Sequence, residues 1–204
     1  MGGRFDLRVD ANAAWNPALA RVRLREFAQF GVSSCEQPTP PAAGYDDWAA
    51  IAAATGCPLM ADESLCTLDD ARRLLAAGNA KADGAGAPGP GGAGLWNLRL
   101  AKNGGFSGLF AFRDLAAAAG VGLHLGALVG ETALLAAAGR AAAGAADFRH
   151  VEYGFHRVLL KGDPFRGGPA GYRGIGAPLP ERPGFGVRLL PEALARVTVR
   201  RERL

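Results

Sequence analysis

The sequence has few cysteines, no long apolar run and little excess charge, and each of these absences excludes a class of protein. Only three of the 204 residues are Cys, none in a CxxC motif, and an odd number argues against a secreted disulfide framework. No apolar run reaches the roughly 18 residues of a membrane span, because Gly139 and Arg140 interrupt the Ala-rich segment 132–146. The start, MGGRFD, lacks the basic and apolar regions of a signal peptide. We therefore expect a soluble protein of the cytoplasm.

The charge of the chain is close to balanced, with 23 Lys and Arg against 19 Asp and Glu. Much of the basic excess lies in the C-terminal string RVTVRRERL, which favours a solvated tail over a nucleic-acid surface. Apolar residues make up 49% of the chain, which excludes a disordered protein and predicts a sizeable core. We expect neither nucleic acid nor a membrane as a partner.

Short strand patterns alternate with helical patterns along most of the chain. In FDLRVDAN, for example, Phe5, Leu7 and Val9 fall on one face and polar side chains on the other. The predicted strands cover 5–12, 32–38, 57–63, 95–102, 121–128 and 149–154, and the helices between them cover 17–30, 46–55, 67–78, 107–119 and 131–143. This order predicts an α/β fold with parallel strands over residues 1–154. Residues 155–204, rich in Gly, Pro and Arg, are predicted to form an irregular tail packed on it.

A segment of small residues, 79–94, breaks this alternation and is predicted to be an inserted surface loop. It contains the pattern GxGxxG twice. A dinucleotide-binding fingerprint follows a strand and opens a helix, whereas here a helix precedes the pattern and a strand follows it. The context therefore favours a loop over a nucleotide site.

Acidic residues end three consecutive predicted strands: Asp10, Glu36 and Asp62. The carboxyl ends of parallel strands share one rim, so these carboxylates are expected to converge. Carboxylates that converge repel one another unless a cation lies between them, and oxygen ligands suit Mg²⁺ or Mn²⁺ better than Zn²⁺. The alternative is that they are three unrelated acids, each solvated or capping a helix.

The fourth predicted strand has one apolar and one polar face. Trp96 and Leu98 alternate with Asn97 and Arg99, so the polar pair should point toward the carboxylates. Arg99 has two interpretations with the same geometry: it neutralises the carboxylates, or it faces an anionic substrate. Lys102 follows near the strand end, where Gly-rich residues require a tight turn.

Several strings of the sequence together resemble the C-terminal barrel domain of the enolase superfamily, the mandelate racemase/muconate lactonizing enzyme group, in its muconate-cycloisomerase-like branch. The strings are VDAN (9–12), EQP (36–38), ADES (61–64), NLRLAKNGG (97–105), LVGETALLAAAGR (128–140) and GIGAPLPERPGFGV (174–187). The resemblance implies a partial (β/α)8 TIM-type barrel of about six strand–helix units, truncated at its N-terminus.

The resemblance also implies a site and a reaction. By position, Asp10, Glu36 and Asp62 would be the ligands of Mg²⁺, and Asn12 and Glu131 would contact a small carboxylate substrate. The chemistry of the family is abstraction of a proton α to a carboxylate, with an enediolate stabilised by the metal. The expected activity is that of a lyase or isomerase, similar to muconate cycloisomerase or o-succinylbenzoate synthase.

The sequence departs from this family at its bases. Arg99 stands where the branch has its acid/base lysine, and a guanidinium is a poor base, which disfavours racemase or epimerase activity. Arg99 and Lys102 are the catalytic candidates, Lys102 only if the strand twists it inward. The KxK pair of the second barrel strand is absent, as is any counterpart of the capping domain. Two alternatives stay open: a non-catalytic truncated remnant and a dipeptide-epimerase-like enzyme. Unpaired first and last strands would favour a homo-oligomer.

Overall fold

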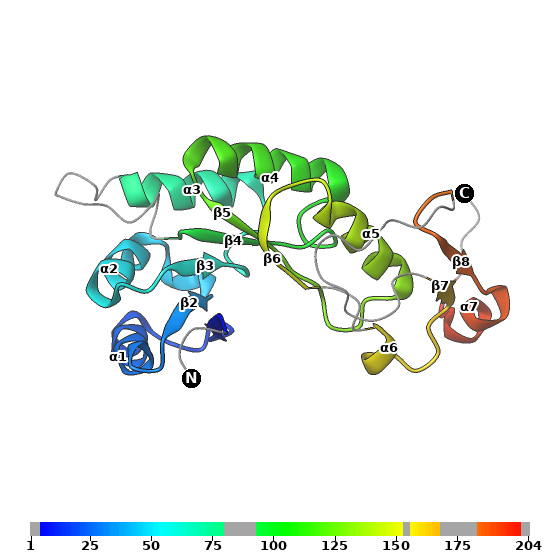
Figure 1. The fold of residues 1–204 in the computed structure, drawn as a ribbon, viewed down its shortest axis with the longest axis horizontal. Helices are drawn as coiled ribbons and strands as arrows, with labels where there is room; N and C mark the ends of the chain where they lie inside the picture. Colours follow the sequence, from blue (N-terminus) through cyan, green and yellow to red (C-terminus); the bar gives the residue numbers. More distant parts are fainter. Residues whose placement is uncertain (1–4, 80–92, 153–155, 168–182, 201–204) are drawn as a thin grey trace. The chain divides into compact units, whose positions relative to one another are not determined.

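The computed structural model describes residues 5–79, 93–152, 156–167 and 183–200 (Figure 1). Its main sheet contains β1 (Leu7–Asp10), β2 (Val32–Glu36), β3 (Leu59–Ala61), β4 (Leu95–Leu98), β5 (Gly122–Leu125) and β6 (Phe148–Val151). The strands follow one another in sequence order, and β1, β2, β3 and β4 pair in parallel. Parallel neighbours in sequence order with helical crossovers are the topology of a (β/α) barrel, so the predicted fold class is confirmed.

Helices connect successive strands of this sheet. They are α1 (Pro17–Ala28), α2 (Asp46–Thr55), α3 (Leu68–Asn79), α4 (Gly105–Ala119) and α5 (Ala133–Ala143), with a 3₁₀ turn, η1 (Pro41–Ala43), before α2. Each of the five lies within two residues of its prediction at either end. The signals are local: Asn16 accepts a hydrogen bond from the Leu19 N–H at 2.9 Å to cap α1, and Gly56, at a φ of 66°, ends α2. Of the predicted insertion 79–94, residues 80–92 lie outside the described residues.

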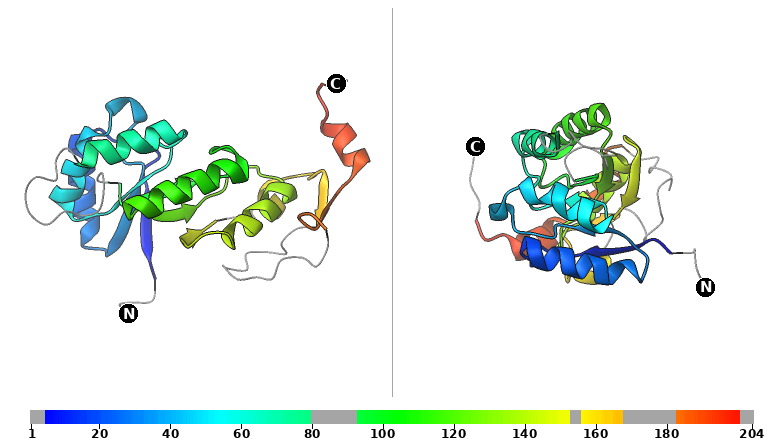
Figure 2. Two further views of the ribbon diagram at one scale, coloured as in Figure 1. Left: turned by 90° about the horizontal axis from the view of Figure 1, so that it is seen from above. Right: turned by 90° about the vertical axis from the view of Figure 1, so that its left-hand side faces the viewer.

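The chain forms two compact units, each with its own packing: Met1–Leu98 with Ser107–His124, and Arg99–Phe106 with Leu125–Leu204. In the first unit, α1 packs against α2 and α2 against α3, as Figure 2 also shows. Trp96 of β4 lies against Phe112 of α4 with edge-to-face rings whose centroids are 6.3 Å apart. The apolar face of β4 therefore packs on a helix, as its alternation predicts.

The second unit contains more regular structure after residue 155 than the sequence predicts. It includes α6 (His156–Leu159), β7 (Phe165–Gly167), β8 (Val187–Leu189) and α7 (Pro191–Val197), and β7 pairs with β8 in antiparallel fashion. Strands of three residues are too short to show the alternation of apolar and polar residues by which a strand is recognised. The Gly-, Pro- and Arg-rich composition of this segment therefore predicted an irregular tail. The Asp163 carboxylate accepts a hydrogen bond from the Ala133 N–H at 2.7 Å and so joins this segment to the start of α5.

Within the described ranges, the helices are all too short or too polar to cross a bilayer.

Candidate active site

Strand register places two of the three predicted carboxylates on one face of the sheet in the first unit. Asp10 lies opposite Glu36 in the β1–β2 pair, and Glu36 lies opposite Met60 in the β2–β3 pair. Asp62 follows Met60 by two residues and lies in the bend just after β3, which ends at Ala61, so strand alternation does not decide its direction. Asp10 and Glu36 therefore project from the same face at the ends of neighbouring strands, and Asp62 directly follows the end of the third strand. Glu36 and Asp62 are buried, 8% and 2% exposed, while Asp10 is exposed.

The donor chemistry of this face suits a hard divalent cation. Three carboxylates supply only oxygen, which Mg²⁺ and Mn²⁺ prefer, and a cation would offset the cost of burying two of them on neighbouring strands. Among the residues that the structure describes, no group of three His, Cys, Asp or Glu side chains stands close enough to hold a metal. Asp10 and Glu36 thus share a face of the sheet, without a closed ligand cage in the described part of the chain.

Asn97 of β4 reaches one of these carboxylates. Its Nδ2 donates a hydrogen bond to Oε1 of Glu36 at 2.6 Å, and Asn97 is 1% exposed. Since Glu36 belongs to β2 and Asn97 to β4, this bond passes over β3, on the face of the sheet that carries Asp10 and Glu36. The prediction that Asn97 points toward the carboxylates is confirmed by this contact.

The turn after β1 fixes the carboxylate of Asp10. Asp10 Oδ1 accepts a hydrogen bond from the Asn12 N–H at 2.8 Å, and Asn12 and Ala13 both have left-handed backbones, with φ of 46° and 60°. Such a turn suits Asn, which tolerates positive φ better than most residues. The Asn12 side chain is exposed, and its contact with substrate stays a prediction.

Gln37, which sequence reasoning quoted only as part of EQP, is fully buried at the centre of a hydrogen-bond network. Its Oε1 accepts from the backbone N–H groups of Asp62 and Ser64, both at 3.1 Å. Its Nε2 donates to the Ser64 hydroxyl at 2.6 Å and to the Thr39 carbonyl at 2.7 Å. The only sign of it in the sequence is its position directly after the candidate ligand Glu36.

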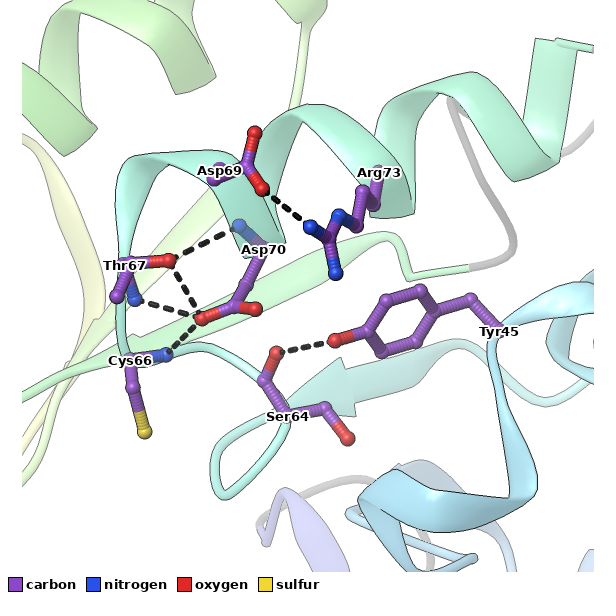
Figure 3. A network of polar contacts seen from close by, with 7 residues as sticks. All are labelled: Tyr45, Ser64, Cys66, Thr67, Asp69, Asp70 and Arg73. Carbon is purple, nitrogen blue, oxygen red and sulfur yellow. Dashed lines mark hydrogen bonds and ion pairs between the residues drawn. The ribbon is translucent and has the colours of Figure 1, made fainter.

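The loop between Asp62 and α3 is also held at its far end (Figure 3). The Asp70 carboxylate accepts hydrogen bonds from the N–H groups of Cys66 and Thr67 and from the Thr67 hydroxyl, which in turn accepts from the Asp70 N–H. This reciprocal pattern is a capping box. Tyr45 donates its hydroxyl to the Ser64 carbonyl at 3.1 Å. The segment that begins with Asp62 is therefore anchored by Tyr45, just before α2, and by Asp70 of α3.

Two further residues of the first unit, Arg8 and His124, contact each other in the interior. The Arg8 guanidinium lies 3.0 Å from Nδ1 of His124, which is fully buried. A guanidinium only donates, so Nδ1 is the acceptor in this contact. His124 is therefore held within the core by a residue of β1.

Arg99, Lys102 and Glu131 belong to the second unit. Because β4 ends at Leu98, Arg99 begins a turn whose carbonyl accepts from the N–H groups of Lys102 at 3.0 Å and Asn103 at 2.9 Å. Lys102 lies in this turn and not on a strand, so strand twist does not decide its direction. Arg99 and Lys102 are both half-buried. Their catalytic roles stay predictions.

Burial raises the pKa of Glu131 above its usual value, while a hydrogen bond from the Leu128 N–H and the positive charge of Arg99 act in the opposite direction. The bond from Leu128 to Oε1 of Glu131 measures 2.8 Å. Arg99 and Glu131 therefore interact electrostatically within their unit. Whether Glu131 contacts substrate stays a prediction.

Comparisons with known proteins show the family to which this chain is related. Residues 1–193 match the family described as enolase C-terminal domain-like. The L-Ala-D/L-Glu epimerase of Bacillus subtilis (strain 168) is 31% identical over 192 residues, 92% of this chain and 47% of the relative. The muconate lactonizing enzyme from Pseudomonas putida has a TM-score of 0.75 and 28% identity, over 96% of this chain and 50% of that one.

A third similar structure is that of the dipeptide epimerase from Cytophaga hutchinsonii complexed with Mg and the dipeptide D-Ala-L-Val. Its TM-score is 0.75 at 26% identity, over 94% of this chain and 48% of that one. The chain thus spans about half the length of the relatives that it matches.

Proposed function

Because the chain belongs to the enolase C-terminal domain-like family, we propose that it carries the metal site of an enzyme that removes a proton α to a carboxylate. The observation that supports the proposal is the register that sets Asp10 opposite Glu36 and Glu36 opposite Met60, two residues before Asp62. Relatives named as epimerases and as a lactonizing enzyme support an isomerase or lyase on a small carboxylate.

The three carboxylates would hold Mg²⁺, with Mn²⁺ as the alternative. The cation would supply positive charge to the substrate carboxylate and so increase the acidity of the adjacent C–H. The bond from Asn97 keeps one oxygen of Glu36 in a fixed direction, and the turn at Asn12 does the same for Asp10. The protein's own part is to fix the direction of its carboxylate oxygens before any ion arrives.

The basic residues decide which reaction this proposal favours. Arg99 stays protonated near neutral pH and serves as a fixed positive charge toward an anion, while Lys102 is the base available in the same turn. Exchange of a proton between two faces needs two bases, whereas cycloisomerisation or dehydration needs one. We therefore propose chemistry similar to that of muconate cycloisomerase or o-succinylbenzoate synthase, with Asn12 and Glu131 as substrate contacts.

A second candidate is dipeptide epimerisation, favoured by the 31% identity to the L-Ala-D/L-Glu epimerase. The two candidates differ in isotope exchange. With a dipeptide in D₂O, an epimerase incorporates deuterium at the α-carbon of recovered, unreacted substrate. We expect no such incorporation, and its appearance would assign the epimerase activity instead.

The metal site is tested by calorimetric titration of Mg²⁺ into the full chain. Asp62→Asn should weaken binding by at least about tenfold, because it removes one of three anionic ligands. Asp69→Asn is the matched control, since Asp69 is exposed on α3 and pairs with Arg73 at 2.7 Å. Equal affinity of the wild type and Asp62→Asn would refute the proposed site.

A further inference from the structure

We propose that Gln37 is the positioning residue that sets the three candidate ligands, Asp10, Glu36 and Asp62, in register with one another. This inference rests on the proposed function, because it concerns the same metal site. It goes further by assigning that role to a residue that is not itself a ligand. Gln37 directly follows Glu36 and is fully buried.

The backbone of Gln37 joins the neighbouring segments on both sides. Its N–H donates to the Met60 carbonyl of β3 at 2.9 Å. Its carbonyl accepts from the Ala13 N–H at 2.8 Å, in the turn that follows Asp10. Through these two bonds, one residue connects the strand of Glu36 to the chain on either side of it, where the other two candidate ligands lie.

The side chain of Gln37 makes the connection to Asp62 specific. An amide has two N–H donors and two acceptor lone pairs, and here all four are used. The oxygen accepts from the N–H groups of Asp62 and Ser64, and the nitrogen donates to the Ser64 hydroxyl and the Thr39 carbonyl. A side chain with only acceptors, only donors or neither cannot reproduce this set.

The backbone conformation of Gln37 indicates that these bonds hold it in place. Its φ is 33°, a value that residues other than Gly rarely adopt. A residue keeps such a conformation when its surroundings over-determine it, and such positions cluster at functional sites. The hydrogen bonds of Gln37 are the surroundings that do so here.

The first test is titration of the full chain with Mn²⁺, with the bound and free ion measured by electron paramagnetic resonance. Gln37→Met should weaken Mn²⁺ binding by about tenfold or more, as is typical when a group that orients a ligand is lost. Thr39→Val is the structural control: it removes the bond from the Trp48 indole N–H at 2.9 Å in the same network but leaves Gln37 and Asp62 bonded. Thr39→Val should lower thermal stability and leave Mn²⁺ affinity unchanged.

The second test needs no metal and measures hydrogen exchange at the amides of Asp62 and Ser64. Gln37→Met should speed exchange at both by at least about tenfold relative to the wild type. A Gln37→Glu variant retains an oxygen that can accept both N–H groups, so it should protect both amides as the wild type does. If Gln37→Met fails to fold, faster exchange at these amides in Gln37→Glu would still contradict the proposal.

The outcomes separate the two proposals. Unchanged Mn²⁺ affinity in Gln37→Met, or an equal loss in Thr39→Val, overturns the role of Gln37 while the proposed function stands. Unchanged amide exchange in Gln37→Met overturns it as well. A wild type that binds no Mn²⁺ overturns the proposed function itself, and with it the ligand set that Gln37 is proposed to align.

Discussion

Replacement of Asn97 by Leu tests the buried face of the sheet most directly. Leu is close to Asn in shape but donates no hydrogen bond, so Asn97→Leu removes the 2.6 Å bond to Glu36 and little else from the packing. Both residues are buried, and water therefore replaces the lost donor poorly. The variant leaves the Glu36 carboxylate with one donor fewer.

The expected loss follows from the character of this bond. A hydrogen bond to a charged acceptor contributes about 1.5–3 kcal/mol, and the apolar surface that Leu buries returns part of it. We expect the free energy of unfolding to fall by about 2 kcal/mol. For a chain of this length, that corresponds to a decrease in Tm of roughly 4–8 °C.

The measurement is urea unfolding of the wild type, Asn97→Leu, Glu36→Gln and the double variant without divalent cations. Glu36→Gln removes the charge but keeps an acceptor, so it serves as the control for the charge-assisted part of the bond. The cycle should give a coupling free energy of about 1–2 kcal/mol. Equal stability of wild type and Asn97→Leu, with no coupling in the cycle, would refute the reasoning that the inner face depends on this bond.

Three further outcomes are expected. Arg99→Lys supplies a titratable amine at the position where the resemblance to the family implies a lysine base, so deuterium incorporation at the α-carbon of a carboxylate substrate should exceed that of the wild type and of Arg99→Gln. Burial raises the pKa of Cys57 from 9.0 to about 11, and that of Cys35 rises for the same main reason. Because the folded state holds the Cys57 proton more tightly than the unfolded state, this thiol contributes stability below pH 9.0 and loses that contribution as the pH rises toward 11. Urea unfolding should therefore show a decline in the free energy of unfolding over this pH range. The Cys57→Ala variant should show a smaller decline. Asp163→Ala removes the acceptor of the Ala133 N–H at the start of α5 and should cost about 1–2 kcal/mol, visible as faster amide exchange at Ala133.

Strand ends were the most predictable part of this protein. Alternation and capping residues are local signals, and from the sequence alone they place the carboxylates of Asp10, Glu36 and Asp62 at the ends of consecutive strands. Parallel pairing then brings strand ends together whatever the details of packing. In the structure, Asp10 lies directly opposite Glu36 in the β1–β2 pair, as expected for residues at the ends of neighbouring parallel strands.

The residues that hold these carboxylates were much less predictable. Gln37 is polar, follows a strand and precedes a proline, a pattern that also fits an exposed turn residue. Its burial follows from long-range pairing, because the amide groups that it binds lie 25 and 27 residues further along the chain. No local periodicity encodes such a contact. The polar network around Gln37 is thus set by tertiary structure, whereas the candidate ligands follow from the order of strands in the sequence.

The turn at Arg99 shows where alternation ceases to apply. Alternation predicted a strand through residue 102, but β4 ends at Leu98, since the Asn103 side chain accepts the Arg99 N–H at 2.8 Å and draws the chain into a turn. Gly104 and Gly105 complete the turn at φ of 80° and 67°, values that suit glycine. The Asn-Gly-Gly string therefore ends the strand four residues before the end that alternation predicts. Because the alternation of side chains along β4 stops at Leu98, the direction of the Lys102 side chain depends on the geometry of the turn. The proposal that Lys102 is a base therefore rests on the chemistry of its amine and not on its position along a strand.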